Sequence, residues 1–321
     1  MRLSDRVGKT GLLQLSEKLF VKLEFMNPTG SIKDRPATYI INDAEKRKLL
    51  KKGDTIIEAT SGNMGISFAW LAAERGYNCK IVMPSNMSEE RKQMLRLYGA
   101  ELIEVSAGNF DEAIRLRNEL AEKNGWFNCN QFAHPMNVLA HRETTAKEIY
   151  NEIVKSKGLF LEGFVSGTGT GGTLMGAGLR LKEKVPMMKV IAVEPAESPV
   201  MSGGEPGLHG IQGIGDGSKF LVDLKRVDEV ITIKTEEAKE RSRNLAKETG
   251  FFVGISAAAN VLAAERWIEK TKPKTTKPKT TEPQTTTPKE QNQKTAKPKT
   301  KNNIFRFPDQ TVLATKTKSI S

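Results

Sequence analysis

Residues 55–83 read TIIEATSGNMGISFAWLAAERGYNCKIVM, and this stretch contains the pattern on which the fold depends. Its first five residues, Thr55 to Ala59, are rich in β-branched side chains and predict a short buried strand. Apolar residues at helical spacing follow from Ile66 to Ala73, and Gly76 marks the end of that helix. Residues Lys80 to Met83 then predict a second strand. Strand, helix and strand in this order are typical of a parallel α/β unit.

The same alternation of strand and helix continues along the chain. Ser88, followed by Glu89 and Glu90, predicts the start of a helix, because a hydroxyl caps the first turn and acidic side chains favour its dipole. Further short apolar runs predict strands at residues 101–105, 164–165, 189–193 and 230–233. Such strands, separated by helices, indicate parallel sheets covered on both faces. They form two runs, 37–137 and 138–270, which predict two α/β layers with a cleft between them.

The composition is that of a globular chain of 321 residues, with 38% hydrophobic and 6% aromatic residues. The low aromatic content argues against a stacking surface for nucleic acid. Cys79 and Cys129 are too few for a disulfide framework or a four-thiolate zinc site, and the three histidines have no metal-ligand spacing, so we expect no metal. Neither a long apolar run nor an apolar secretory signal is present. We therefore expect a cytoplasmic protein with no membrane partner.

Most of the net charge of +12 is concentrated in one segment. Residues 271–301 contain nine Lys, two Glu and regularly spaced Pro, without one large apolar side chain. Such a segment cannot bury enough surface to offset the entropy of ordering, so we expect it to be disordered. It could be a basic tether for an anionic partner, but we favour a tolerated insertion, because lengthening a loop costs little. Ile304 to Phe307 then predict a strand that returns to the core.

A loop rich in glycine and threonine follows the strand predicted at residues 164–165. It reads GTGTGGT from Gly167 to Thr173 and precedes a helical run. Glycines let a backbone approach a ligand, the free amides at a helix start bind phosphate, and the three threonine hydroxyls add donors. The loop also matches G-x-G-x-x-G, with Glu194 where a dinucleotide-binding fold would hold a ribose. We favour a phosphate cup for a smaller cofactor, and a purely structural turn is the other alternative.

Two further loops place polar groups at the start of a predicted helix. The first is Thr60-Ser61-Gly62-Asn63, whose amides, hydroxyls and carboxamide suit a carboxylate, although a simple N-cap would also explain them. The second reads NPTGSIKDR from Asn27 to Arg35 and places Lys33 near a helix start, where the dipole disfavours a cation. Such a lysine should have a lowered pKa and be nucleophilic. The alternative is a solvated surface lysine.

These three loops, in this order, resemble those of the fold-type II pyridoxal-phosphate (PLP) enzymes, and most closely those of the cysteine synthases (O-acetylserine sulfhydrylases). The similarity runs from about Val7 to Ile268 and again from Ile304 to about Leu313. Residues 22–35, KLEFMNPTGSIKDR, resemble the family's Schiff-base motif. Other similar segments are the substrate-carboxylate loop at 60–63, the phosphate loop at 169–173, and the residues 194–198, 210–215 and 253–256.

The resemblance implies a role for each matching residue. Lys33 would hold PLP in a Schiff base and then remove the α-proton of the substrate. Asn63 would bind the ring oxygen of the cofactor, and Ser256 would face its pyridine nitrogen. The expected phosphate contacts are Gly169, Thr170, Gly171, Gly172 and Thr173, and the expected substrate contacts are Thr60, Ser61, Gly62, Met64, Gln131 and Gly213.

The same resemblance implies the architecture, the reaction and the partners. Two three-layer α/β/α domains would enclose a PLP cleft. Residues 37–137 would form the smaller, mobile domain, 1–36, 138–270 and 302–321 would form the larger one, and 271–301 would be an insertion. The reaction would be a β-replacement, in which an O-activated serine, most simply O-acetylserine, and sulfide give L-cysteine. A homodimer is expected, and serine acetyltransferase is a candidate partner.

Three departures from the family pattern leave the substrate open. Met64 stands where the family usually has Thr, and a thioether cannot donate to a carboxylate. One lost hydrogen bond to a charged group is worth about 1.5–3 kcal/mol, so we expect weaker binding or another substrate. Ala257 and Ala258 replace a Ser-Gly pair, and Gly11 replaces a Pro.

Other functions compete with cysteine synthesis. A β-elimination enzyme and a cystathionine-type synthase would use the same chemistry and remain alternatives. An NAD-dependent dehydrogenase would rest on the G-x-G-x-x-G match and would leave Lys33 unexplained. If the protein were an inactive scaffold, the basic segment 271–301 would carry its function.

Overall fold

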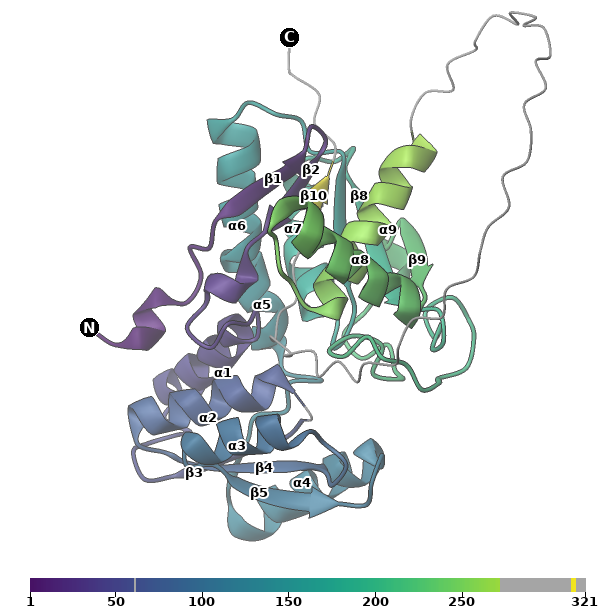
Figure 1. The fold of residues 1–321 in the computed structure, drawn as a ribbon. Helices are drawn as coiled ribbons and strands as arrows, with labels where there is room; N and C mark the ends of the chain where they lie inside the picture. The colour runs from purple at the N-terminus through teal and green to yellow at the C-terminus, as the bar shows by residue number, and fades with distance from the viewer. Residues whose placement is uncertain (61, 272–312, 316–321) are drawn as a thin grey trace, which may run out of the picture.

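The computed structural model describes residues 1–60, 62–271 and 313–315, which build two sheets with flanking helices (Figure 1). The stretch that opened the sequence analysis folds as β3 (Thr55–Ala59), α2 (Asn63–Arg75) and β4 (Asn78–Pro84). The two strands pair in parallel, with Thr55 opposite Asn78. The predicted strand–helix–strand unit is therefore confirmed, and α2 begins at the last residue of the predicted substrate loop.

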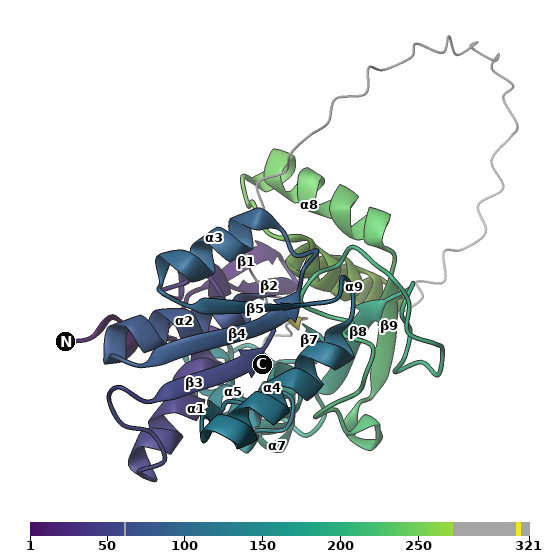
Figure 2. The same cartoon turned by 90° about the horizontal axis from the view of Figure 1, so that it is seen from below.

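The smaller sheet has the strand order β5-β4-β3-β6, and all its pairs are parallel. Ile56 and Ile81 belong to one apolar core with α2 and α1, whereas Ile57 and Val82 belong to a second core on the other face. Figure 2 shows α3 and α4 on opposite sides of this sheet. The remaining elements of this part are α1 (Asp34–Lys46), α3 (Glu89–Leu97), β5 (Glu101–Val105), α4 (Phe110–Asn124) and β6 (Phe127–Asn128).

The larger sheet has the order β1-β2-β10-β7-β8-β9 and is mixed. Its strands β7, β8 and β9 are parallel, as predicted. β1 and β2 are antiparallel, because only a two-residue turn joins them and such a turn connects antiparallel strands. β10 is antiparallel to both β2 and β7. The bounds are β1 (Leu12–Ser16), β2 (Leu19–Lys22), β7 (Gly163–Gly167), β8 (Lys189–Pro195), β9 (Glu229–Ile233) and β10 (Leu313–Thr315).

Helices also cover both faces of the larger sheet. Val165 packs in a core with helices α8 and α9, whereas its neighbour Phe164 packs in a core on the other face. This alternation follows from the period of two in a strand. The helical elements are α5 (Pro135–Glu143), α6 (Thr145–Ile149), the π-helical η3 (Tyr150–Ser156) and η4 (Leu174–Gly178), α7 (Leu179–Lys184), α8 (Thr235–Thr249), α9 (Ile255–Thr271), and the short 3-10 turns η1 (Leu3–Arg6), η2 (Glu24–Met26) and η5 (Leu224–Arg226).

Two sheets, each between two helical layers, confirm the predicted α/β/α fold class. The structure places Thr271, the first residue of the segment predicted to be disordered, at the end of α9. The rest of that segment, 272–301, and the strand predicted at 304–307 lie outside the described residues. The chain does rejoin the large sheet after α9, since β10 pairs with both β2 and β7. The division into domains at residues 37–137 and the mobility of the smaller one stay predictions. No helix within the described ranges combines the length and apolar character needed to cross a bilayer.

Candidate active site

Lys33 occupies the N-cap position of α1, directly after the loop that begins at Asn27. Asp34 fixes this loop, because its carboxylate accepts hydrogen bonds from the backbone N–H of Thr29 (2.7 Å) and from the hydroxyl of Ser67 in α2 (2.6 Å). Desolvation lowers the pKa of Lys33, and the charge of Asp216 opposes this effect. The shift has the predicted direction, and its main cause is burial. A lysine of this kind supplies a neutral amine more readily than a solvated one.

A buried network of charges holds Arg35, two residues after Lys33. The guanidinium of Arg35 forms ion pairs with Glu24 (2.7 Å) and Glu148 (2.8 Å), and Lys22 pairs with Glu148 at 2.8 Å. Burial alone would raise the pKa of Glu148, but the pairs with Arg35 and Lys22 lower it to about 2. The network ties β2, α1 and α6 together, so the start of α1 has a fixed position.

The glycine-rich loop follows β7 and leaves no room for a side chain at its glycine positions. A Cβ on Gly172 would stand 2.0 Å from Oδ1 of Asn137, and one on Gly169 would stand 2.8 Å from the carbonyl oxygen of Gly213. Gly171 has a φ of +87°, a left-handed conformation that favours glycine. The loop is therefore a cradle of backbone amides at the start of a helical segment, which is suited to a phosphate.

The hydroxyls of this loop have different surroundings. Thr168 donates to the carbonyl of Val193 (3.1 Å), which makes it a structural contact rather than a ligand donor. Thr170 accepts a hydrogen bond from the Asn137 amide (3.0 Å), and Thr173 lies 3.2 Å from Nε2 of His141. The predicted set of three threonine donors is thus reduced to Thr170 and Thr173.

The predicted substrate loop lies at the carboxyl end of β3. The backbone N–H of Thr60 donates to Val82 (3.1 Å), and the N–H of Gly62 donates to the Thr60 hydroxyl (3.2 Å). Ser61 lies outside the described residues. Asn63 is the first residue of α2, and its buried amide oxygen has no hydrogen-bond partner within the described part of the chain. An unpartnered buried oxygen favours a polar ligand at this position.

Gln131 joins the two loops through Asn137. Its carbonyl accepts a hydrogen bond from the Asn137 amide (2.9 Å), which also donates to Thr170 of the phosphate loop. Its backbone N–H donates to Glu58 (2.9 Å), a buried carboxylate paired with Arg117 at 2.8 Å. Sequence reasoning did not single out Asn137, because an isolated asparagine after a His-Pro-Met sequence carries no recognisable motif.

Three other predicted residues have distinct surroundings. Ser256 is buried in the first turn of α9. Gly213 is exposed, and its carbonyl oxygen lies 2.8 Å from the position of a Cβ on Gly169. Met64, by contrast, is only 1% exposed and belongs to the apolar core of the smaller sheet. This position gives Met64 no open surface toward a substrate, and it explains why an apolar side chain is tolerated there.

Asp216 is a site residue that sequence reasoning missed. It follows the GIQGIG segment, and its Oδ2 lies 3.1 Å from the position of a Cβ on Gly169. Its charge is coupled to that of Lys33. A single aspartate in a polar, glycine-rich stretch has no sequence signature, so only the folded chain reveals this proximity.

The two thiols lie outside this site and are poor nucleophiles. Cys79 and Cys129 are both buried and unbonded. Burial raises the pKa of Cys79 to about 12 and that of Cys129 in the same direction. Within the described ranges, no group of three His, Cys, Asp or Glu side chains is placed to hold a metal ion.

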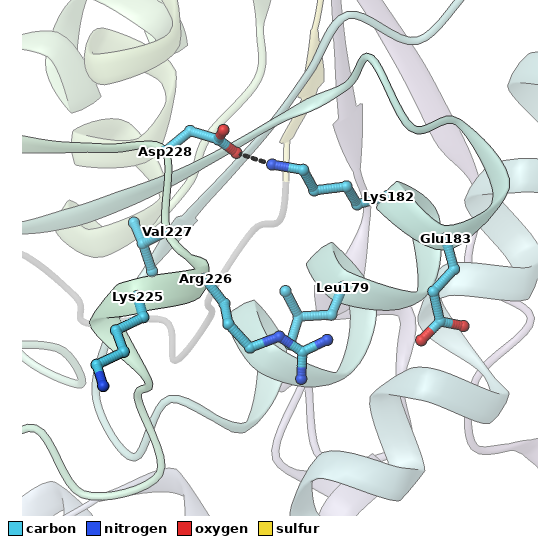
Figure 3. Close-up of a pocket in the computed structure, with 7 residues that line it drawn as sticks. All are labelled: Leu179, Lys182, Glu183, Lys225, Arg226, Val227 and Asp228. Carbon is cyan, nitrogen blue, oxygen red and sulfur yellow. Dashed lines mark hydrogen bonds and ion pairs between the residues drawn. The ribbon is translucent and has the colours of Figure 1, made fainter.

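A surface cavity of about 390 Å³ lies apart from all the predicted site residues (Figure 3). It is formed between α7 and the turn η5, and the ion pair between Lys182 and Asp228 (2.5 Å) closes one side. Its lining residues are Leu179, Lys182, Glu183, Lys225, Arg226, Val227 and Asp228. None of them comes from the three loops, so this cavity is not the candidate active site.

The three loops fit a cofactor that has a phosphate, a polar ring substituent and a carbonyl carbon. The glycine cradle suits the phosphate, the unpartnered amide of Asn63 suits the ring substituent, and the Lys33 amine suits the carbonyl. Fold and site together therefore define an α/β enzyme with a lysine-bound, phosphate-bearing cofactor. A family model described as "Pyridoxal-phosphate dependent enzyme" matches residues 3–280. The chain belongs to this family of PLP-dependent enzymes.

Relatives of known structure or name narrow this class. A cysteine synthase of Staphylococcus aureus is 42% identical over 258 residues, which cover 79% of this chain and 81% of that protein. The crystal structure of an O-ureido-L-serine synthase is 40% identical, with a TM-score of 0.80 over 85% of this chain and 87% of that one. A hydrogen sulfide-producing enzyme from Fusobacterium nucleatum is 41% identical, with a TM-score of 0.79 over 84% and 83% of the two chains.

Replacement of Gly172 by alanine tests the cradle. The new methyl group would overlap Oδ1 of Asn137, whose amide is anchored by Gln131 and Thr170. We expect the affinity for PLP to fall at least about tenfold and the stability to fall by about 1–3 kcal/mol, as for other overpacked sites. Titration of the cofactor-free protein with PLP, followed by absorbance, measures the effect. Gly11→Ala is the control, because its methyl group would meet Leu23 at an ordinary 3.6 Å; an equal loss in both variants would contradict the account.

Proposed function

We propose that this protein is a cysteine synthase, which converts O-acetylserine and sulfide to L-cysteine with PLP as cofactor. The observation that carries the proposal is the position of Lys33 at the start of α1, beside the charge of Asp216 on the segment that borders the glycine cradle. The identity to a cysteine synthase over most of both chains supports the choice of reaction within the PLP class. The position of Lys33 and the similarity to a cysteine synthase both favour a β-replacement on an amino acid.

Bound PLP supplies an electron-withdrawing ring that stabilises negative charge at the substrate's α-carbon. The residues of this chain then bind, orient and move protons. We assign the phosphate to Gly169, Thr170, Gly171, Gly172 and Thr173. The amine of Lys33 takes the α-proton, and desolvation favours its neutral, proton-accepting form. With the α-proton removed, the acetate leaves from the β-carbon, and sulfide bonds to the same carbon.

Substrate orientation is assigned to the groups at the ends of β3 and β6. Thr60, Gly62 and Asn63 present a hydroxyl and a helix start to the substrate carboxylate, and Ser61 completes the assigned loop. Gln131 stands beside them, with its backbone fixed by Glu58 and Asn137. Such fixed donors lower the barrier by positioning the substrate. Ser256 is assigned to the pyridine nitrogen, where a neutral hydroxyl leaves the ring unprotonated, and Gly213 lines the substrate side.

The assembly and location follow the resemblance. We propose that the chain forms a homodimer and that serine acetyltransferase is a partner, as is expected of cysteine synthases. A cytoplasmic location is proposed with them, and it is supported by two unbonded cysteines, which suit a reducing compartment.

A comparison of amino-acid donors tests the proposed reaction. The purified full chain with PLP is supplied with sulfide and either O-acetylserine, O-phosphoserine or serine, and L-cysteine is quantified. We expect O-acetylserine to react at least about tenfold faster than serine, because acetate is a much better leaving group than hydroxide. Equal or faster reaction with serine would favour a different synthase. A colourless protein that binds NAD would overturn the assignment altogether.

One observation favours a second activity at the same site. The carboxyl group of Asp216 is coupled electrostatically to Lys33, and its Oδ2 lies 3.1 Å from the position of a Cβ on Gly169. Such a group can protonate a basic leaving group. The departure of acetate does not require this protonation. The second candidate function is therefore β-elimination or replacement on L-cysteine with release of sulfide. The similarity to a hydrogen sulfide-producing enzyme from Fusobacterium nucleatum supports this second candidate.

A further inference from the structure

The imidazole of His141 is a buried titratable group that the assigned roles do not use. It belongs to α5 and is only 2% exposed. Its Nε2 lies 3.2 Å from the hydroxyl of Thr173, the last residue of the glycine cradle, and its Nδ1 lies 3.0 Å from the hydroxyl of Thr145, the first residue of α6. The two hydroxyls and the ring therefore form a hydrogen-bonded row that ends at the cradle assigned to the phosphate.

Close packing of α5 against η4 holds the ring in place. A Cβ on Gly176 of η4 would stand 2.2 Å from the carbonyl oxygen of Val138 and 2.9 Å from Cβ of His141. The two backbones therefore meet at a point where only glycine fits. Thr145 is fully buried and Thr173 is 8% exposed, so the row is shielded from bulk water. The ring has a fixed position behind the cradle.

The surroundings favour the neutral form of the imidazole. Burial lowers the pKa of His141, and the positive charges of Arg35 and Lys33 lower it further. The charge of Glu148 opposes these effects without reversing them. A neutral imidazole has one N–H donor and one nitrogen acceptor. One of the two threonine hydroxyls must therefore donate to the ring, and the other must accept from it.

The neutral ring permits two directions for this row. In the first, Thr145 donates to Nδ1 and the Nε2–H donates to the oxygen of Thr173, so the O–H of Thr173 is available to a ligand. In the second, the Nδ1–H donates to Thr145, and Thr173 uses its only proton on Nε2. Within the described part of the chain, neither hydroxyl has a second hydrogen-bond partner. A phosphate dianion only accepts hydrogen bonds, so the first direction alone makes Thr173 a phosphate donor.

We propose that His141 is a positioning residue for the cofactor, whose Nε2–H donates to the oxygen of Thr173 and thereby directs the Thr173 hydroxyl proton to the phosphate of PLP. The proposal deepens the proposed function and rests on its assignment of the phosphate to the glycine cradle. Thr145 donates to Nδ1 and keeps the ring in the required tautomer. The row also strengthens the last hydrogen bond, because successive hydrogen bonds polarise one another. His141 acts through Thr173 and does not itself touch the substrate.

Two substitutions of His141 in the full chain test the proposal. The short amide of His141→Asn reaches only the position of Nδ1, whereas the longer amide of His141→Gln can place an N–H where Nε2 stands. We expect PLP to bind His141→Asn about 10–100-fold more weakly than the parent, the range for one lost hydrogen bond to a charged group. His141→Gln should restore the affinity to within about threefold of the parental value, because it keeps the donor to Thr173. Titration of the cofactor-free chain with PLP, followed by absorbance, measures both affinities.

Pyridoxal, which lacks the phosphate, separates this role from one in packing alone. It binds the same lysine but offers no phosphate to Thr173, so the parent and His141→Asn should bind pyridoxal equally well. An equal loss of affinity for PLP and pyridoxal would overturn the proposal. Thr173→Val removes the hydroxyl itself and should weaken PLP binding as His141→Asn does. The double variant should bind PLP no more weakly than Thr173→Val, and additive losses would overturn the proposal.

The position of the imidazole proton is a test that needs no substitution at the site. In the PLP-loaded parent, the ¹⁵N resonances of His141 should show a proton on Nε2 and none on Nδ1, and the reverse would overturn the proposal. His134→Asn is the matched control, since asparagine can still accept the hydrogen bond that the Met136 N–H donates, and both affinities should be parental. A chain that behaves as predicted toward PLP and pyridoxal but makes no cysteine from O-acetylserine would support His141 and contradict the proposed function.

Discussion

Lys33→Ala is expected to reduce cysteine formation by at least about 10³-fold, because it removes both the covalent anchor of the cofactor and the base for the α-proton. The variant should fold normally, because Asp34 fixes the start of α1 through its hydrogen bonds with Thr29 and Ser67. Cysteine formation from O-acetylserine and sulfide gives the rate, and circular dichroism reports the fold.

Lys46→Ala is the matched control, because this lysine is exposed at the last turn of the same helix. It should retain full activity and bind PLP as the parent does. If Lys33→Ala kept more than about a tenth of the parental rate, another group would have to supply the base, and the assigned mechanism would be wrong.

Arg35→Met is expected to destabilise the fold by about 3–5 kcal/mol, the range for removal of one partner from a buried ion pair. Arg35 is fully buried, and its loss leaves Glu24 without its closest cation and Glu148 with Lys22 alone. The same change loosens the start of α1, so PLP affinity should fall with stability. Urea denaturation at neutral pH measures the free energy of unfolding.

The pH dependence of the free energy of unfolding distinguishes loss of the Arg35 ion pairs from simple loss of packing. In the parent, ion pairs hold the pKa of Glu148 at about 2, so its contribution to stability is complete above the unfolded value near 4.5 and is lost as the pH falls toward 2. In Arg35→Met the buried carboxylates lack that cation, their pKa values rise, and stability should increase as the pH is lowered from 7.5 to 5.5. A variant that loses stability over this interval, as for a pure packing defect, would contradict the explanation. Arg47→Met, which breaks only an exposed pair with Asp43, should change stability by less than about 1 kcal/mol.

The sequence was most informative where periodicity and loop chemistry coincide. The predicted strands 55–59 and 101–105 match β3 and β5 residue for residue, because each is a short apolar run between clear turn signals. The glycine cradle was predicted for the same reason, since several glycines after a strand have few structural alternatives. The roles assigned to individual residues in the three loops stay predictions.

Features that depend on distant partners were not predicted. The antiparallel strands β1, β2 and β10 are short, and β10 is placed by pairing with β2 and β7 rather than by its own pattern. Asp216 and Asn137 matter through neighbours more than 30 positions away in the sequence, namely Lys33 and Thr170. Met64 shows the reverse case, because a motif position suggested a substrate contact and the fold gives it a place in the apolar core.

The central claim is that the amine of Lys33 binds PLP covalently. Borohydride reduction of the PLP-loaded full chain, followed by proteolysis and mass spectrometry, tests it directly, because reduction fixes the cofactor to the lysine that holds it. The account predicts one labelled peptide, containing Lys33, and no label in Lys33→Ala. Label on any other lysine of the parent, with Lys33 unmodified, would contradict it.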